Sequence, residues 1–201
     1  MSATWRQRAK EELREGLYET AMTLFRTKGY DEVTVQEITR EAGVAKGTFF
    51  NHFPTKEHVV VEWYRRITSE AMDEVRGRSF DSAEAAVLAA TDAIAVRGTA
   101  APGLVAAKAR LLSTFEPLAD AEREQDHEAR RFLIERIESG RASGELAEDV
   151  AAEFLSDAIL AMLTGTARHW IAAGHEFDLR RTVAERTAFL FRAARAPRAE
   201  S

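Results

Sequence analysis

The strongest constraint on how this chain folds lies in residues 34–56, where two short amphipathic segments flank one glycine. Thr34 stands where it can cap a helix, and Glu37 follows three positions later, as in a reciprocal capping box. Gly43 can adopt the left-handed conformation that ends such a helix and turns the chain sharply. A second short helix is predicted over residues 46–52, because a proline two positions later opposes its continuation.

Two short helices joined by a three- or four-residue turn that contains glycine are typical of a helix-turn-helix, whose second helix enters the DNA major groove. In the predicted second helix Phe49 and Phe53 share one side at i, i+4 spacing, which leaves its polar residues facing outward. An ordinary helical hairpin has a similar pattern, and all-helical proteins contain many of them. The pattern by itself favours the DNA-binding interpretation and leaves the plain hairpin as its alternative.

Further motif residues lie in and around this helix pair: Gly29-Tyr30, Val33-Thr34-Val35, Ile38, Ala42-Gly43-Val44, Gly47-Thr48-Phe49, His52-Phe53 and Lys56-Glu57. Over roughly residues 10–60 they resemble the N-terminal region of TetR-family transcriptional regulators. The resemblance implies an N-terminal helix-turn-helix DNA-binding domain over residues 1–54 and a helical ligand-binding and dimerisation domain over 55–201, with a connecting helix at 55–76. It also implies a repressor that binds a palindromic operator on double-stranded DNA as a homodimer and is released by a small molecule.

Two residues depart from the pattern of that family. Ala45 stands where a serine or threonine often caps the second helix, and Phe50 stands where a tyrosine hydroxyl often reaches a phosphate. The missing hydroxyl removes one possible phosphate hydrogen bond.

The residues expected to contact DNA cluster in and around the predicted second helix. They are Thr34, Lys46, Gly47, Thr48, Phe50, Asn51, His52 and Lys56. Asn51 can pair with an adenine, touch a phosphate or face only water. His52 either approaches the DNA backbone or packs on Phe53 at the surface. Residues 5–10 form a basic arm that either enters a minor groove or frays.

Charge is distributed unevenly along the chain, whose net charge is −5. Residues 1–56 contain nine Lys or Arg and eight Asp or Glu, whereas the remainder contains 19 and 25. The acidic remainder would repel DNA and turn the N-terminal end toward it. Because the N-terminal part is only weakly basic, few phosphate contacts per subunit are expected.

Glycine, proline and capping residues divide the chain into about nine helices, which predicts an all-α fold. Helices are expected from residue 5 or 10 to 27, and over 34–42, 46–52, 55–76, 82–96, 102–115, 119–139, 149–173 and 178–194. The tail beyond Ala196 is expected to be disordered.

The last two predicted helices carry long apolar stripes with small residues between the large ones, a pattern that allows a four-helix dimer interface. The residues assigned to this interface are Leu155, Ile159, Met162, Leu163, Thr166, Val183, Thr187, Leu190 and Phe191. Each of them is equally compatible with the core of a single chain.

A mostly apolar effector pocket is expected among the middle helices. The residues proposed to line it are Leu88, Leu111, Phe115, Phe132 and Trp170, each of which also fits a plain core position. Nothing in the sequence names the chemical class of the effector.

Motifs of enzymes and of metal or cofactor sites are missing from the sequence. It contains no cysteine, no H-E-x-x-H, no G-x-S-x-G and no phosphate-binding loop. We therefore expect no catalytic residues, no metal and no cofactor; an all-helical enzyme and a protein-interaction adaptor remain the alternatives. No apolar stretch approaches the roughly 20 residues of a membrane helix, so we expect a cytoplasmic protein without a membrane partner.

Overall fold

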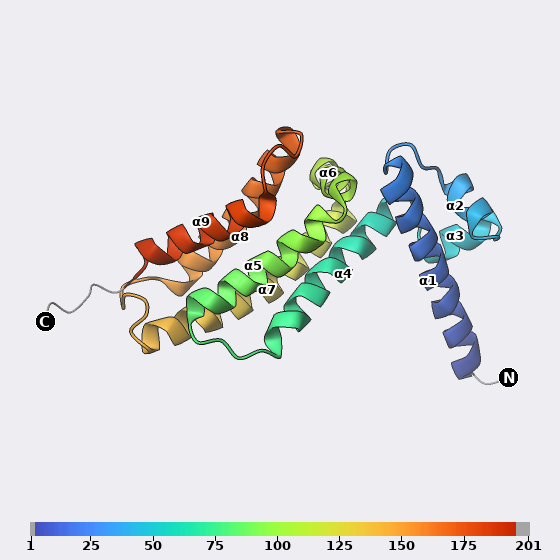
Figure 1. The fold of residues 1–201 in the computed structure, drawn as a ribbon. Helices are drawn as coiled ribbons and strands as arrows, with labels where there is room; N and C mark the ends of the chain where they lie inside the picture. The colour runs from blue at the N-terminus through green and yellow to red at the C-terminus, as the bar shows by residue number, and fades with distance from the viewer. Residues whose placement is uncertain (1–2, 196–201) are drawn as a thin grey trace, which may run out of the picture. The chain divides into compact units, whose positions relative to one another are not determined.

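The computed structural model describes residues 3–195, all of which fall into helices and their connections (Figure 1). The helices are α1 (Ala3–Lys28), α2 (Val35–Glu41), α3 (Lys46–His52), α4 (Glu57–Arg76), α5 (Ala83–Thr99), α6 (Pro102–Leu111), α7 (Glu116–Ala142), α8 (Ala152–Ala172) and α9 (Leu179–Ala193). Extended pairing within this range is limited to one isolated bridge between Leu146 and Arg195. The all-α prediction is confirmed, while the expectation for the tail beyond Ala196 lies outside the described residues.

The chain divides into two compact units. The first contains the residues up to Tyr64 together with Gly103–Ala119, and the second contains Arg65–Pro102 together with the residues from Asp120 onward. Helix α4 therefore contributes to both units, and α6 belongs to the first. The domain boundary expected between residues 54 and 55 stays a prediction.

Helix α1 extends further toward the N-terminus than the sequence indicates. It begins at Ala3, so the basic residues at positions 6, 8 and 10 belong to a continuous helix instead of a frayed arm. The Gln7 side chain donates to Glu11 at 2.8 Å one turn along, a pairing that supports the exposed helix.

The first unit is built around aromatic side chains from several helices. Phe49 of α3 and Phe53, which directly follows α3, are fully buried, and their ring centroids lie 5.6 Å apart. In the same unit, the Phe115 ring meets the edge of His58 at 5.1 Å, which brings the start of α7 against α4. The other helices add buried side chains to the core of this unit: Leu17, Ala21 and Phe25 of α1, Ile38 of α2, Val59, Val60 and Trp63 of α4, and Leu104 and Ala107 of α6.

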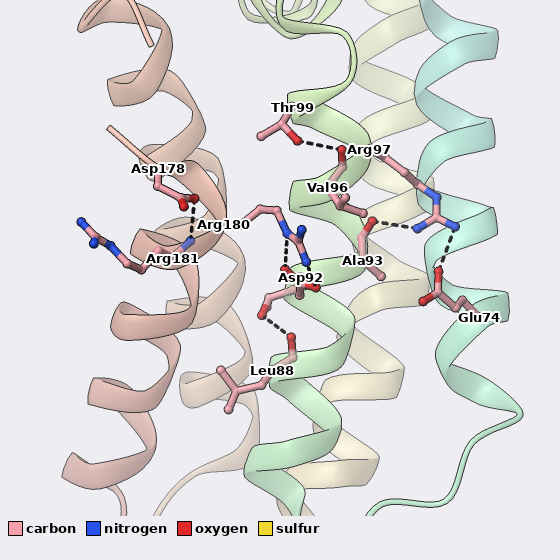
Figure 2. Close-up of polar contacts among 11 residues, drawn as sticks. Glu74, Leu88, Asp92, Ala93, Val96, Arg97, Thr99, Asp178, Arg180 and Arg181 are labelled. Carbon is pink, nitrogen blue, oxygen red and sulfur yellow. Dashed lines mark hydrogen bonds and ion pairs between the residues drawn. The ribbon is translucent and has the colours of Figure 1, made fainter. Parts of the chain in front are cut away.

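In the second unit α5 is tied to a helix on either side (Figure 2). Asp92 accepts from Nε and Nη2 of Arg180 on α9, both at 2.8 Å. The hydrogen bond from Arg180 holds the pKa of the Asp92 carboxyl below its usual value. Toward the other side Arg97 donates to Glu74 of α4 at 3.0 Å and to the Ala93 carbonyl of its own helix at 2.8 Å.

The start of α5 meets the end of α7 at very short range. A Cβ on Gly140 would lie 2.8 Å from the Cβ of Ala83, so this approach requires a glycine. The Glu145 carboxylate then accepts from the backbone N–H groups of Ala83 and Glu84 at 2.7 and 2.9 Å. The N-terminus of α5 thus receives a charged cap from a residue 61 to 62 positions away.

Candidate nucleic-acid interface

Helix α2 begins where the sequence predicts. Thr34 Oγ1 accepts from the Glu37 backbone N–H at 3.2 Å, which is half of the expected capping box. The Glu37 carboxylate contacts the Lys28 ammonium, and this hydrogen bond lowers the pKa of Glu37. The side chain therefore links α2 to the end of α1.

Gly43 turns the chain between α2 and α3. Its φ is +68°, in the left-handed region that favours glycine. The next backbone N–H, that of Val44, donates to the Thr39 carbonyl at 2.9 Å and closes the helix end. This local geometry sets the direction in which α3 leaves the turn.

One face of the seven-residue helix α3 is buried and the other is open to solvent. Phe49 forms the buried side, while Lys46, Gly47, Phe50 and Asn51 are exposed and Thr48 and His52 are partly so. The Phe50 ring, 43% exposed, lies with its centroid 5.9 Å from the Lys46 ammonium. Six of the predicted contact residues thus share one surface, which we call the α3 face: Lys46, Gly47, Thr48, Phe50, Asn51 and His52.

Arg14 of α1 holds the C-terminal end of α3 in place. Its Nη1 donates to the His52 carbonyl at 2.7 Å, and its Nη2 donates to Glu62 of α4 at 2.7 Å. Its guanidinium also lies 4.4 Å from the centroid of the Phe53 ring. A cation at a helix C-terminus is favourable, so this single side chain joins three helices and stabilises the end of α3. No local sequence pattern indicates this role, because the two polar partners of Arg14 are 38 and 48 positions away.

His52 lies in a positively charged setting. Burial lowers the pKa of its imidazole, and the charges of Lys10 and Arg14 lower it further. A hollow of about 240 Å³ opens here, lined by Gln7, Lys10, Glu11, Arg14, Asn51 and His52. The N-terminal half of α1 therefore adds Lys10 to the surface around the α3 face.

Lys56 takes part in internal contacts at the start of α4. Its Nζ donates to the carbonyls of Tyr30 and Val33 at 2.9 and 2.8 Å and lies 4.2 Å from the centroid of the Tyr30 ring. Burial accordingly lowers the pKa of its ammonium. Two of its three N–H groups are engaged. Its contact with a phosphate stays a prediction, and the remaining N–H would have to donate to that phosphate.

The five residues expected to line an effector pocket are divided between the two units. Leu111 and Phe115 belong to the first unit, and Leu88, Phe132 and Trp170 belong to the second. Within the second unit Phe132 packs in the main apolar core, whereas Trp170 packs in a separate cluster with Val183. Of the five, Phe132 lines an apolar cavity of about 10 Å³ between α4, α5, α7 and α8.

Most residues assigned to a dimer interface point into the core of one chain. Burial within a single chain removes them from its surface: Leu155, Ile159, Thr166, Val183, Thr187 and Phe191. These six positions therefore cannot face a second chain while the fold is intact, and only Met162, Leu163 and Leu190 of the assigned set keep partial exposure. The apolar side chains that α8 and α9 do expose are Phe154, 75% exposed, and Phe189, 62% exposed.

Within the part of the chain that the structure describes, no cluster of three or more His, Asp or Glu side chains is suited to hold a metal ion. None of the helices in that range has the length and apolar character needed to cross a bilayer.

Residues 17–62, which contain α2, α3 and the residues around Gly43, match the family model described as bacterial regulatory proteins of the tetR family. This part of the chain is a TetR-family N-terminal region. The transcriptional repressor BepR of Brucella suis biovar 1 is 25% identical over 179 residues, which cover 84% of this chain and 85% of BepR. The regulator YuxN of Bacillus subtilis is 44% identical over 45 residues, but these cover 22% of this chain and only 16% of YuxN.

Solved structures of TetR-family regulators share the fold over nearly the whole chain. FadR of Thermus thermophilus, solved in complex with lauroyl-CoA, is 25% identical with a TM-score of 0.72, and the match covers 93% of this chain and 97% of FadR. A TetR regulator from Haloarcula marismortui is 19% identical with a TM-score of 0.77, covering 92% and 98% of the two chains. The family assignment made from the N-terminal motifs is confirmed.

Replacement of Arg14 tests how α3 is held. Arg14→Gln removes two charge-assisted hydrogen bonds and the contact with Phe53, so we expect the free energy of unfolding to fall by about 1–3 kcal/mol. Urea unfolding followed by circular dichroism measures the change, and hydrogen exchange should show faster opening of α3. Arg26→Gln, at an exposed position of the same helix, is the matched control. Equal stability of the two variants would contradict the role assigned to Arg14.

Proposed function

We propose that this chain is a ligand-responsive transcriptional repressor that binds a palindromic operator as a homodimer, and that it is neither an enzyme nor an adaptor. The observation that carries the proposal is the α3 face, a set of polar and cationic groups exposed on a short helix whose other side is buried. The repressor BepR is similar to this chain over most of its length, which supports the same kind of activity here.

Within the α3 face the residues divide by chemistry. Lys46 and Thr48 suit phosphate oxygens, because a cation or a hydroxyl can donate to them without reading sequence. Asn51 is exposed and carries the donor and acceptor pair that matches the major-groove edge of adenine. We propose that Asn51 reads a base while Lys46, Thr48 and His52 position the helix. Thr34 and Lys56 then add contacts beside their structural roles.

The few cations around the α3 face agree with a modest electrostatic contribution to the affinity for DNA. The exposed Lys10 lies beside Asn51 and His52 in the same hollow, so α1 adds one cation to the surface proposed to face DNA. Neutral His52 can gain a proton when a phosphate approaches, because a nearby negative charge favours the charged imidazole. DNA binding should therefore strengthen as the pH falls toward the range in which free His52 titrates.

We propose that the exposed faces of α8 and α9 form the dimer contact. Phe154 and Phe189 are large apolar side chains left in water by the single chain, and small exposed residues such as Ala161 and Gly165 allow close helix approach. Two helices from each chain would then make a four-helix interface. A dimer is also what a two-fold symmetric operator requires, since two α3 helices must enter successive major grooves about 34–36 Å apart or a multiple of that.

The effector is proposed to act by population shift. FadR proteins of similar fold have been solved with lauroyl-CoA and stearoyl-CoA, which supports a small-molecule effector for this chain as well. Helix α4 runs from the first unit into the second, so a molecule bound beside its second half can favour a different placement of its first half. Only differential affinity for the two conformations can produce release.

Lys46→Ala tests the DNA contact directly. We expect weaker binding to any short duplex and a plot of log affinity against log salt whose slope is smaller in magnitude by about one per subunit. Fluorescence anisotropy of a labelled duplex at several salt concentrations measures both quantities. Arg123→Ala removes the same charge from an exposed position of α7, outside the proposed dimer contact, and should change neither. The same salt slope for wild type and Lys46→Ala would refute the assigned contact.

Charge reversal of the apolar surface tests the dimer. Phe154→Glu combined with Phe189→Glu should yield monomers, because four carboxylates would have to be desolvated in one interface. Sedimentation velocity reports the change in mass, and circular dichroism should stay the same because both side chains are exposed. The control pair Phe154→Leu and Phe189→Leu keeps the surface apolar and should remain dimeric. A dimer that survives the glutamate variants would place the interface elsewhere.

A further inference from the structure

A polar cleft of about 410 Å³ opens on the second unit, lined by α4 and α7. Its walls are Arg76 of α4 and Glu128, Arg131, Phe132, Glu135 and Arg136 of α7, and we call it the arginine cleft. Three guanidinium groups face two carboxylates, so the cleft is positively charged although the chain as a whole carries −5. Its volume falls within the range of about 300–1,000 Å³ that small-molecule sites occupy.

The arginines of the cleft have unused hydrogen-bonding capacity. Arg136 donates from Nη2 to Glu135 at 2.7 Å, but its Nε is buried and has no partner. Arg76 approaches Glu128 only to 3.4 Å, longer than a strong charge-assisted hydrogen bond. Arg131 is exposed and forms no ion pair with any residue in the described range. A buried donor without an acceptor is costly, so a bound anion would stabilise this arrangement.

Phe132 separates the arginine cleft from the apolar interior. Its ring lies with its centroid 5.3 Å from the Arg136 guanidinium, and it is also a wall of the apolar cavity of about 10 Å³. Met72, Leu160 and Leu163 also line that cavity, and the methionine is a flexible side chain that can adapt to an inserted group. A cationic surface and an apolar space thus meet at one side chain.

We propose that the arginine cleft binds the anionic headgroup of an amphipathic effector, whose apolar tail passes Phe132 into the core between α4, α5, α7 and α8. The planar guanidinium groups suit phosphate or carboxylate, since both accept two parallel hydrogen bonds from an arginine. This inference rests on the proposed function, because it names the chemical class of the effector.

The apolar cavity is too small to receive an alkyl chain without a change in the packing around it. About 10 Å³ holds at most one water molecule, so an alkyl chain can enter only if the surrounding side chains move apart. Met72 is one of them, and it belongs to the helix that continues into the first unit. The effector-bound chain would therefore differ in conformation from the free chain at α4. Release of DNA then requires that the effector bind this altered conformation more tightly than the conformation that binds DNA.

Calorimetric titration of the full chain tests the proposal with four probes: octyl phosphate, octanoate, octan-1-ol and inorganic phosphate. We expect octyl phosphate to bind about tenfold or more tightly than octan-1-ol, which lacks the charge, and than inorganic phosphate, which lacks the tail. Octanoate distinguishes a carboxylate from a phosphate headgroup, and tighter binding of either octyl anion supports the site. If neither octyl phosphate nor octanoate binds more tightly than octan-1-ol, or if neither binds more tightly than inorganic phosphate, the proposal is overturned.

Variants locate the two ends of the ligand. Arg131→Gln should weaken octyl phosphate binding about tenfold and leave octan-1-ol unaffected, whereas Arg123→Gln, an exposed position of α7 outside the cleft, should change neither. Leu163→Phe fills the apolar cavity and should weaken every octyl compound, with thermal unfolding as the check that the variant folds. Wild-type affinity for octyl phosphate in both Arg131→Gln and Leu163→Phe would place the ligand elsewhere and refute the proposal.

Failure of the proposed function is distinguishable from failure of this inference, because calorimetry contains no DNA. A chain that binds octyl phosphate in the cleft but no duplex DNA would keep the site and refute the repressor. A chain that binds duplex DNA but not octyl phosphate or octanoate would keep the repressor and refute the amphipathic effector.

Discussion

Burial of one side of α3 is the constraint on which the candidate interface depends. Isolated helices shorter than about 12–15 residues are marginal in water, and α3 has seven residues. Its helical form therefore depends on Phe49 and Phe53 in the core and on Arg14 at its C-terminal end. Because these contacts use only one side of the helix, the opposite side stays open for a partner, and its orientation is fixed by the core of the first unit.

The second unit is held by a different set of contacts. Pairs of charged residues fix α5 to α4 and to α9, and Gly140 allows α5 and α7 to touch. The core between α4, α5, α7 and α8 contains a small cavity of about 10 Å³ at Phe132. A closely packed core responds to an inserted group by shifting between discrete arrangements. A cavity this small is therefore compatible with a conformational change that occurs only when a ligand enters the core.

Local features of the structure followed from the sequence, whereas long-range ones did not. The cap at Thr34, the turn at Gly43 and the i, i+4 pair of Phe49 and Phe53 depend on neighbours within a few residues, and the helices appear where those signals predict them. The association of α6 with the first unit has no local signal, because its contacts lie far away in the chain. The internal contacts of Lys56 were likewise hidden, since its partners lie 23 and 26 positions earlier.

Apolar periodicity revealed which helix faces are buried but not what buries them. Six residues assigned to a dimer interface on α8 and α9 have their partners inside one chain, and the exposed Phe154 and Phe189 lie outside the assigned set. The prediction of the effector-pocket residues had the same limit, because the sequence of five apolar side chains on separate helices does not reveal which of them share a cavity. Phe132 lines a cavity and also lies beside the charged residues of the arginine cleft, which come together only in the folded chain.

Selection of bound sites from a pool of random duplex DNA shows whether two α3 faces are presented in two-fold symmetry. We expect an enriched palindrome whose half-site centres are separated by about 10–10.5 base pairs or a multiple of that. A pool that remains random after repeated selection at low salt, or an enriched sequence without two-fold symmetry, would contradict this expectation.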